Sequence, residues 1–158
     1  MDPSSHHETA EVKVLILRTR ENSDLPLPAY ATPGSAGLDL RACIPQSITL
    51  LPGSRALVGT GLAVALPPGT EAQIRPRSGL AAEHGVTLLN SPGTVDSDYR
   101  GEIRLVVINL GQTPFTIHRG DRIGQMVVGE VSRVALEEVK HLPESGRNAG
   151  GFGHTGTN

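Results

Sequence analysis

Residues 90–102 bring together side chains that could bind a ring and activate water. Two carboxylates, Asp96 and Asp98, stand two positions apart, and either could accept a proton from a water molecule. Tyr99, one of only two tyrosines, lies among small and charged residues, a placement that suits a ring or sugar packed on its face. The segment predicts a hairpin with a rigid tip and a backbone exposed to a ligand. An ordinary hairpin with solvated acids fits the same residues.

A pattern suited to anion binding begins at Arg77, where a short helix is predicted over residues 78–85. We expect Ser78 to be its N-cap and Gly85 to end it. A helix N-terminus offers unpaired N–H groups and the positive end of a dipole, and Ser78 and Gly79 would present them. Arg77 could add a planar guanidinium that pairs with phosphate oxygens. A serine that only caps the helix is the simpler interpretation, and it is compatible with a bound phosphate.

Two further segments, 36–42 and 119–126, place polar side chains on or beside predicted strands. Asp39 lies between two leucines, so the alternation of a strand puts it on the opposite, polar face. Gln125 opens an apolar strand, where a polar residue is unexpected. The simpler interpretations are a solvent-facing aspartate and a salt-bridged turn in the Arg-Gly-Asp-Arg sequence at 119–122.

The glycine-rich segment 147–156 contains a single aromatic residue, Phe152, with glycine on both sides. Such a segment could wrap closely over a ligand, although glycine-rich ends usually indicate disorder. No core-forming pattern follows Leu142. The sequence therefore predicts three parts, which are a disordered N-terminus at 1–10, a β domain at 11–142 and a flexible C-terminal arm at 143–158.

The elements that must position these segments are short β-strands. Apolar runs are separated by proline and glycine about every eight to twelve residues, a spacing typical of a sandwich or barrel. Twelve prolines and nineteen glycines would be hard to place in helices. We predict an all-β fold with one short helix. The predicted strand regions are 12–17, 47–51, 56–66, 71–75, 86–89, 103–110, 115–117 and 125–131.

Composition argues against several classes of protein. Tryptophan is absent and aromatic residues make up 3%, so Val, Leu, Ile and Ala must fill the core, which suits thin β layers. The formal net charge of −2 gives no basic surface for a nucleic-acid polymer. Cys43 is the only cysteine, and no apolar run reaches the roughly 20 residues that cross a bilayer. We therefore expect a cytoplasmic protein with no membrane partner.

Taken together and in order, the five segments resemble the five motifs of the trimeric dUTPase family. The matching sequences are AGLDLRA, RPRSGLA, GTVDSDYRGEI, RGDRIGQM and RNAGGFGHTG, and the resemblance extends from Leu27 to the C-terminus. It implies a jelly-roll-like β subunit, three of which form a homotrimer with three shared active sites. It also implies hydrolysis of dUTP to dUMP and diphosphate, which limits uracil in DNA and supplies dUMP for dTMP synthesis.

The resemblance assigns roles to individual residues. Asp96 would deprotonate the water that attacks the α-phosphorus and would hold the deoxyribose 3′-OH. Tyr99 would exclude ribonucleotides where a 2′-OH would project. Mg²⁺ would be held mostly by phosphates and water rather than by a protein cage, with Asp39 acting through water and Gln125 near the α-phosphate. The other implied substrate-binding residues are Arg77, Ser78 and Gly79 for the phosphates, Asn90, Thr94, Val95 and Arg104 for uracil, and Arg147, Phe152, Gly153 and His154 in the closing arm. Many family members have serine at the position of His154.

Two alternative functions deserve comparison. A dCTP deaminase relative would share the fold and part of the third motif, but those relatives use a glutamate on the following strand. Here no Asp or Glu lies between Glu102 and Asp121. A non-catalytic trimeric module that binds nucleotides or proteins would not need a water-activating acid together with Arg77, Gln125 and a closing arm.

Overall fold

A computed structural model describes residues 11–149, and over this range the chain forms eleven β-strands and one short helix. Every strand pair is antiparallel. The predicted all-β fold with one short helix is therefore confirmed. The elements are β1 (Leu15–Arg18), β2 (Leu38–Arg41), β3 (Ile48–Leu50), β4 (Arg55–Gly59), β5 (Leu62–Ala65), β6 (Thr70–Arg75), α1 (Ser78–His84), β7 (Val86–Leu88), β8 (Gly93–Val95), β9 (Arg104–Asn109), β10 (Phe115–Ile117) and β11 (Arg122–Glu130).

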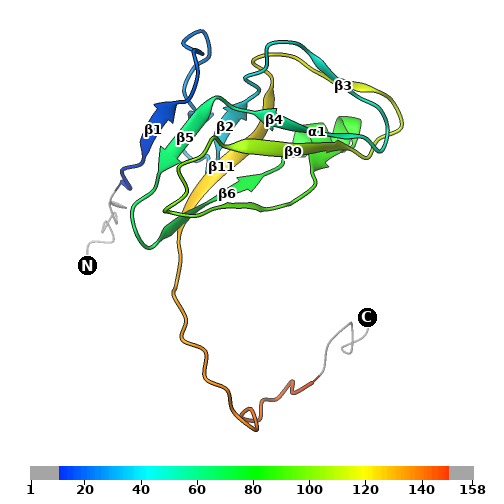
Figure 1. The fold of residues 1–158 in the computed structure, drawn as a ribbon. Helices are drawn as coiled ribbons and strands as arrows, with labels where there is room; N and C mark the ends of the chain where they lie inside the picture. The colour runs from blue at the N-terminus through cyan, green and yellow to red at the C-terminus, as the bar shows by residue number, and fades with distance from the viewer. Residues whose placement is uncertain (1–10, 150–158) are drawn as a thin grey trace, which may run out of the picture.

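The core lies between a four-stranded sheet, β2-β11-β6-β8, and a three-stranded sheet, β4-β9-β7 (Figure 1). Leu40 and Met126 of the first sheet and Leu105 of the second are buried in one cluster. Gly124 allows the two sheets to approach closely, because a Cβ at this position would overlap with Leu105. Aliphatic side chains fill most of the cluster, as the composition predicts, and Phe115 packs only against its edge. Two-stranded sheets, β1-β5 and β10-β3, complete the body.

The predicted strand region 56–66 is two strands rather than one. β4 ends at Gly59 and β5 begins at Leu62, because the chain turns at Thr60 and Gly61. Gly61 has a φ of +68°, which glycine adopts without the steric cost that a Cβ would bring. The prediction of a single run was wrong because apolar residues continue through the turn and hide it.

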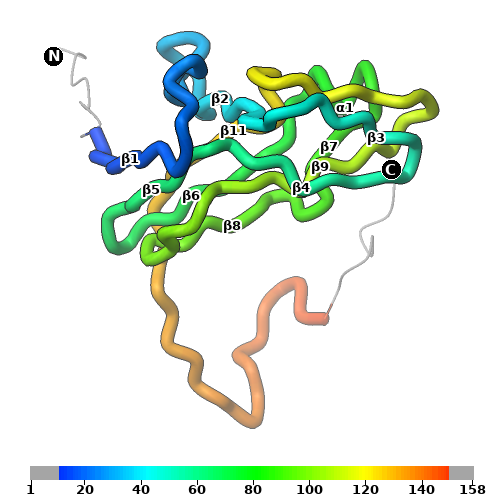
Figure 2. The backbone as a smooth tube through the Cα atoms, turned by 45° about the horizontal axis from the view of Figure 1, so that its top comes forward, coloured from blue at the N-terminus to red at the C-terminus, as the bar shows by residue number. Residues whose placement is uncertain are grey.

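The predicted hairpin within 90–102 is also wrong. β8 pairs with β6, whereas β9 pairs with β4 and β7, so the segment between them crosses from one sheet to the other (Figure 2). Both strands find their partners elsewhere in the chain, and a hairpin of neighbouring strands is not formed. The crossing leaves β8 at the edge of its sheet.

The helix α1 occurs where it was predicted, but its cap differs. Arg77 is the N-cap, with extended backbone angles, and no side chain hydrogen-bonds to the helix start. The prediction that Ser78 caps the helix was wrong by one residue, because Ser78 is itself helical. Gly85 ends the helix in the left-handed conformation, as expected. Within the described range, no helix has the length and apolar character needed to cross a membrane.

After β11 the chain leaves the body of the molecule. Residues 132–149 contain no helix or strand and are exposed, and Figure 1 shows this segment running away from the sheets. The division of the chain at Leu142 stays a prediction.

Candidate functional site

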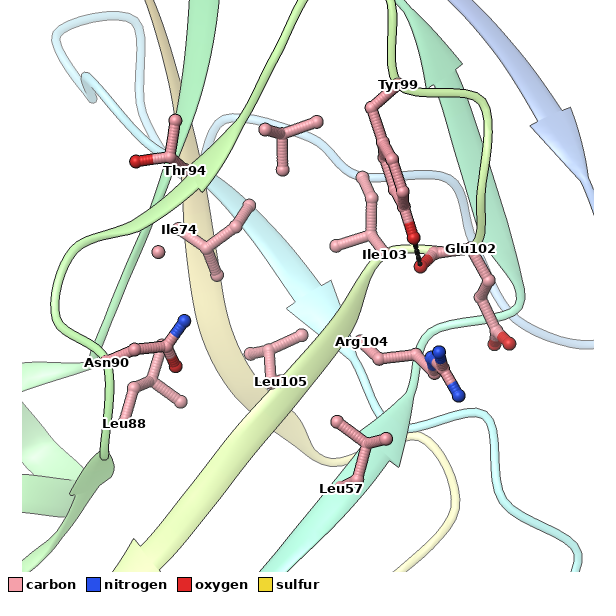
Figure 3. A pocket seen from close by; sticks show the side chains of 12 residues that line it. Leu57, Ile74, Leu88, Asn90, Thr94, Tyr99, Glu102, Ile103, Arg104 and Leu105 are labelled. Carbon is pink, nitrogen blue, oxygen red and sulfur yellow. Dashed lines mark hydrogen bonds between the residues drawn. The ribbon is translucent and has the colours of Figure 1, made fainter.

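A pocket of about 200 Å³ opens between β8 and β9, where the chain crosses between the two large sheets (Figure 3). β8 is an edge strand. β7 pairs with β9 from Asn109 to Val107, so it does not pair with the first residues of β9. The backbone of β8 therefore faces the start of β9 at Arg104 with no strand between them. We call this space the β8–β9 pocket. Its lining residues are Leu57, Ile74, Leu88, Asn90, Gly93, Thr94, Val95, Tyr99, Glu102, Ile103, Arg104 and Leu105.

The β8–β9 pocket has an apolar floor and a polar rim. Ile74, Leu88 and Leu105 form part of the floor, and Figure 3 shows Asn90 and Tyr99 on opposite sides of these side chains. This arrangement suits a flat ring that buries its faces and hydrogen-bonds at its edge. The structure brings together five residues that the sequence predicts for uracil and deoxyribose, namely Asn90, Thr94, Val95, Tyr99 and Arg104.

Tyr99 is held in place by the loop that carries it. Its hydroxyl donates a hydrogen bond to the backbone oxygen of Glu102 at 3.1 Å, drawn as a dashed line in Figure 3. Its backbone N–H donates to the oxygen of Asp96 at 3.1 Å. The ring packs against Gly101, where a Cβ would lie 2.9 Å from Tyr99 Cε2 and closer still to the hydroxyl. The loop therefore holds both the hydroxyl of the ring and the backbone that carries it.

A second pocket, of about 350 Å³, gathers positive charge at the start of α1. We call it the arginine pocket, because three arginines and a single carboxylate line it. This excess of guanidinium groups favours a ligand with several negative charges. Its lining residues are Ala31, Ser35, Ala36, Gly37, Asp39, Arg75, Arg77, Ser78, Gly79, Arg122, Gln125 and Val127.

Asp39 bridges two of the arginines in this pocket. Asp39 Oδ1 lies 3.3 Å from Arg77 Nε, and Asp39 Oδ2 lies 3.0 Å from Arg122 Nη1. Leu40, the next residue on β2, points into the core, so the alternation predicted for this strand is confirmed. Gln125 is the cross-strand partner of Asp39, and its Nε2 donates to the oxygen of Pro76 at 3.1 Å. The structure thus places Asp39, Arg77 and Gln125 side by side.

Arg122 is a residue of this pocket that sequence reasoning missed. It stands three positions before Gln125, and strict alternation would put the two side chains on opposite faces of β11. The pairing of β11 with β2 shifts register between Arg122 and Gly124, and this irregularity brings both side chains to the same face. Arg122 belongs to the Arg-Gly-Asp-Arg sequence at 119–122, but that sequence does not show which of its charges faces Asp39.

The Arg-Gly-Asp-Arg sequence forms a turn but not the internal salt bridge considered above. Arg119 pairs with Asp24, with its Nη2 2.7 Å from Asp24 Oδ1, and Arg122 pairs with Asp39. Asp121 instead accepts a hydrogen bond from the backbone N–H of His118 at 2.7 Å. The three charged residues of this turn therefore bond to three different parts of the chain.

Asp96 lines neither of these two pockets. It borders a third pocket of about 400 Å³ together with Glu71, Asp98 and Arg133, among others. Arg147 lies on the exposed segment after β11. The three remaining predicted residues, Phe152, Gly153 and His154, lie outside the described residues. A single chain therefore holds the predicted site residues in separate groups.

A β fold with an apolar pocket rimmed by polar side chains and a second pocket lined by arginines has the kinds of groups that nucleotide-binding proteins use. A dUTPase family model matches residues 23–156, and this chain belongs to the dUTPase family. The deoxyuridine 5′-triphosphate nucleotidohydrolase of Caldanaerobacter subterraneus subsp. tengcongensis is 58% identical over 141 residues, covering 89% of this chain and 95% of the relative. The enzyme of that name from Neorickettsia sennetsu is 56% identical over 145 residues, covering 92% and 96%.

Solved structures of phage dUTPases share the fold. The dUTPase of Staphylococcus bacteriophage 80alpha with dUPNHPP matches with a TM-score of 0.82 at 20% identity, covering 91% of this chain and 98% of the phage chain. A mutant dUTPase from phage phi11 of S. aureus, described with a structural Mg(II) ion, matches with a TM-score of 0.73 at 18% identity, covering 82% and 97%. At these identities the likeness establishes the jelly-roll-like fold alone.

Proposed function

We propose that this chain is a dUTP diphosphatase, which hydrolyses dUTP to dUMP and diphosphate and so limits uracil in DNA while supplying dUMP for dTMP synthesis. The observation that carries the proposal is membership of the dUTPase family over nearly the whole chain, with relatives of that activity matched almost end to end. The two pockets supply the chemistry that such a substrate requires, because one suits a base and sugar and the other a triphosphate.

Uracil binds in the β8–β9 pocket, where the open backbone of β8 and the start of β9 read its edge. Asn90 adds a side-chain amide, and Thr94, Val95 and Arg104 contribute at the two strands. A fixed pattern of backbone donors and acceptors separates uracil from cytosine, because the two bases differ in donor and acceptor at one ring edge. We expect this pocket to exclude the methyl group of thymine.

Tyr99 packs against the deoxyribose and excludes a 2′-OH by steric contact. Support comes from the way the loop fixes the ring, since a rigid wall discriminates by shape better than a mobile one. UTP and dUTP differ only by this hydroxyl, so the position of the Tyr99 ring decides between them.

The triphosphate binds in the arginine pocket. Arg77 pairs with phosphate oxygens, Ser78 and Gly79 offer hydroxyl and backbone donors at the start of α1, and Gln125 lies near the α-phosphate. Asp39 holds Arg77 and Arg122 in place before the ligand arrives. When phosphates bind, the two guanidinium groups exchange part of their pairing with Asp39 for pairing with the ligand.

Asp96 is the general base. Its carboxylate accepts a proton from the water that attacks the α-phosphorus, the bond from that phosphorus to the bridging oxygen breaks, and diphosphate leaves. Asp96 also holds the 3′-OH of the deoxyribose. Its position immediately after Val95, which lines the β8–β9 pocket, supports a place near the sugar. General-base catalysis of this kind contributes about 10²- to 10⁴-fold.

Three copies of the chain form a homotrimer in which neighbouring subunits complete each site. Support comes from the separation of the predicted residues into three groups in one chain. The β domain spans residues 11–142 and the arm 143–158 closes over the substrate, with Arg147, Phe152, Gly153 and His154 contacting it.

We also place the enzyme in the cytoplasm, since its one cysteine, Cys43, is a free and buried thiol.

Mg²⁺ is the metal that we expect with the triphosphate. Among residues 11–149 there is no group of three or more His, Cys, Asp or Glu side chains that could hold a metal ion, and Asp39 is the single carboxylate of the arginine pocket. These residues fit an ion bound mainly by phosphate oxygens and water, with Asp39 reaching it through water. Bound there, Mg²⁺ would neutralise charge on the phosphates.

Release of diphosphate by the purified protein with Mg²⁺ tests the proposal, with dUTP compared against dCTP, dTTP and UTP. We expect rapid release from dUTP alone. Ammonia produced from dCTP would indicate a deaminase instead. No reaction with any of the four, together with measurable nucleotide binding, would indicate a non-catalytic binding module.

A further inference from the structure

Glu102 is one of the residues that line the β8–β9 pocket (Figure 3), but its carboxylate is bonded to other parts of the protein. The N–H of Gly61 donates to Glu102 Oε1 at 2.7 Å, and Arg20 Nη2 donates to Glu102 Oε2 at 2.5 Å. The Glu102 side chain is 15% exposed, which is less than any other carboxylate in a salt bridge among the described residues. Charge-assisted hydrogen bonds in such a partly buried place are stronger than those in water.

The turn between β4 and β5 is shaped to receive this carboxylate. A Cβ at Gly59 would lie 2.6 Å from Glu102 Oε1, so any larger residue would displace the carboxylate from its place. Gly61 has a positive φ, and this conformation presents its N–H to the carboxylate. The buried hydroxyl of Thr60 donates to the oxygen of Ile103 at 2.7 Å. The turn is thereby joined to two successive residues of the loop that follows Tyr99.

The same residue holds the hydroxyl of Tyr99 from its backbone side. Tyr99 donates to the oxygen of Glu102, and Gly101 lies against the Tyr99 ring. A single short chain of contacts therefore runs from Arg20 and the Gly61 N–H through Glu102 to the phenol. Ile103 stays bonded to Thr60 and Leu62, so loss of the carboxylate would loosen the Glu102 side of this loop, and with it the acceptor that fixes Tyr99, without releasing the loop from the turn.

We propose that Glu102 is a positioning residue for Tyr99 and thereby a determinant of selectivity for deoxyribose over ribose. The proposal rests on the proposed function, because it requires that Tyr99 excludes the 2′-OH. The Glu102 carboxylate is bonded to Gly61 and Arg20, so in this proposal it acts on the nucleotide through Tyr99. A displacement of about 1 Å at a group that contacts substrate is enough to change rates by up to about a hundredfold, and we expect about a tenfold change here.

The test compares kcat/KM for dUTP and UTP in Glu102→Ala, Glu102→Gln and Glu102→Asp. Glu102→Ala should lower the dUTP-to-UTP ratio about tenfold, mainly by raising activity on UTP relative to dUTP. Glu102→Gln should recover most of the ratio, because an amide oxygen can still accept from Gly61. Glu102→Asp keeps the charge but is one methylene shorter, so its dUTP-to-UTP ratio should fall between those of the alanine and glutamine variants. It also provides a test in case the alanine variant does not fold.

Two controls separate positioning from stability. Arg20→Ala removes only the exposed ion pair, with Arg20 47% exposed, and should change the ratio by less than about threefold. Asp24→Asn weakens another arginine–carboxylate pair, whose two residues line neither pocket, and should leave kcat/KM for both substrates unchanged. A thermal melt of each variant reports folding.

The outcomes distinguish failure of the role of Glu102 from failure of the proposed function. The role of Glu102 would be overturned if Glu102→Ala or Glu102→Asp folded and kept the wild-type dUTP-to-UTP ratio. It would also be overturned if these variants lost kcat/KM equally for dUTP and UTP, in step with a lower melting temperature. Wild-type protein that releases no diphosphate from dUTP would instead contradict the proposed function. A ratio that falls in Glu102→Ala and returns in Glu102→Gln supports the inference.

Discussion

The β8–β9 pocket and the arginine pocket differ in what holds their side chains before a ligand binds. In the first, hydrogen bonds to backbone and close packing on glycine fix the residues, and these contacts can persist when a ring enters. In the second, Asp39 neutralises Arg77 and Arg122, so charge that would bind the ligand is already paired. The first pocket is prepared in shape, whereas the second must exchange partners.

This difference assigns selectivity between nucleotides to the β8–β9 pocket and affinity for the triphosphate to the arginine pocket. Shape can discriminate between nucleotides that differ by one hydroxyl or methyl group, because a fixed wall admits one and excludes the other. Charge cannot make that distinction, since all nucleoside triphosphates carry the same phosphates. We therefore expect changes in the β8–β9 pocket to alter selectivity, and changes in the arginine pocket to alter affinity for every triphosphate equally.

The largest effect should come from Asp96, which belongs to neither pocket. Asp96→Asn should lower kcat about 10³-fold, because it removes the base while keeping the size of the side chain. Binding of a non-hydrolysable dUTP analogue should stay close to wild type in calorimetry, since both pockets are intact. Asp98→Asn is the matched control, because Asp98 borders the same third pocket. Near-normal turnover by Asp96→Asn would show that another group activates the water.

Next in size, Arg77→Ala should raise KM and lower kcat/KM about a hundredfold for dUTP, because a charge-assisted phosphate contact is lost. Binding of dUMP should weaken much less than binding of dUTP, and the salt dependence of KM should become shallower. Arg55→Ala serves as control, since Arg55 is exposed on β4 and lines neither the β8–β9 pocket nor the arginine pocket. A change in the dUTP-to-UTP ratio on losing Arg77 would contradict the division between shape and charge.

Much of this architecture could be predicted from local sequence. Proline and glycine mark the strand ends, Gly85 ends the helix as expected, and Asp39 points away from the core because alternation is a local property of a strand. The grouping of Asn90, Thr94 and Tyr99 followed from the family resemblance, and the structure brings them to one pocket.

What could not be predicted depends on pairing between distant segments. The bulge that turns Arg122 toward Asp39 exists only in relation to β2, and the sequence of β11 alone gives no sign of it. The separation of β8 from β9 into different sheets likewise depends on partners far along the chain. The sequence alone assigns no role to Glu102, because its partners Arg20 and Gly61 are remote in sequence.

A smaller effect should follow from Gly101→Ala, which tests the packing of Tyr99 directly. An added Cβ would overlap with the Tyr99 hydroxyl and displace the ring, so the dUTP-to-UTP ratio should fall about fivefold to tenfold, with a loss of about 1 kcal/mol in stability. Gly129→Ala is the matched control, since no heavy atom lies within 4 Å of the added Cβ there. Steady-state kinetics on both nucleotides and urea unfolding measure the two effects. Unchanged selectivity would place the barrier to ribose on another residue.

The smallest effect concerns a charge pair that serves the fold and neither pocket. The hydrogen bond from Arg119 lowers the pKa of Asp24 below its ordinary value of 3.8. Because the unfolded chain then binds the proton more readily, the stability that the pair contributes is present above pH 3.8 and is lost as the pH falls through the lowered pKa. Asp24→Asn should therefore lower the urea midpoint slightly at pH 7, and the difference from wild type should shrink below pH 3.8. Turnover of dUTP at pH 7 should be unchanged, whereas Asp39→Asn should lower it, because it weakens the pairing that holds Arg77 and Arg122 in place before the ligand binds. If Asp24→Asn lowered turnover as much as Asp39→Asn, the charge in the arginine pocket would have no special role in binding the ligand.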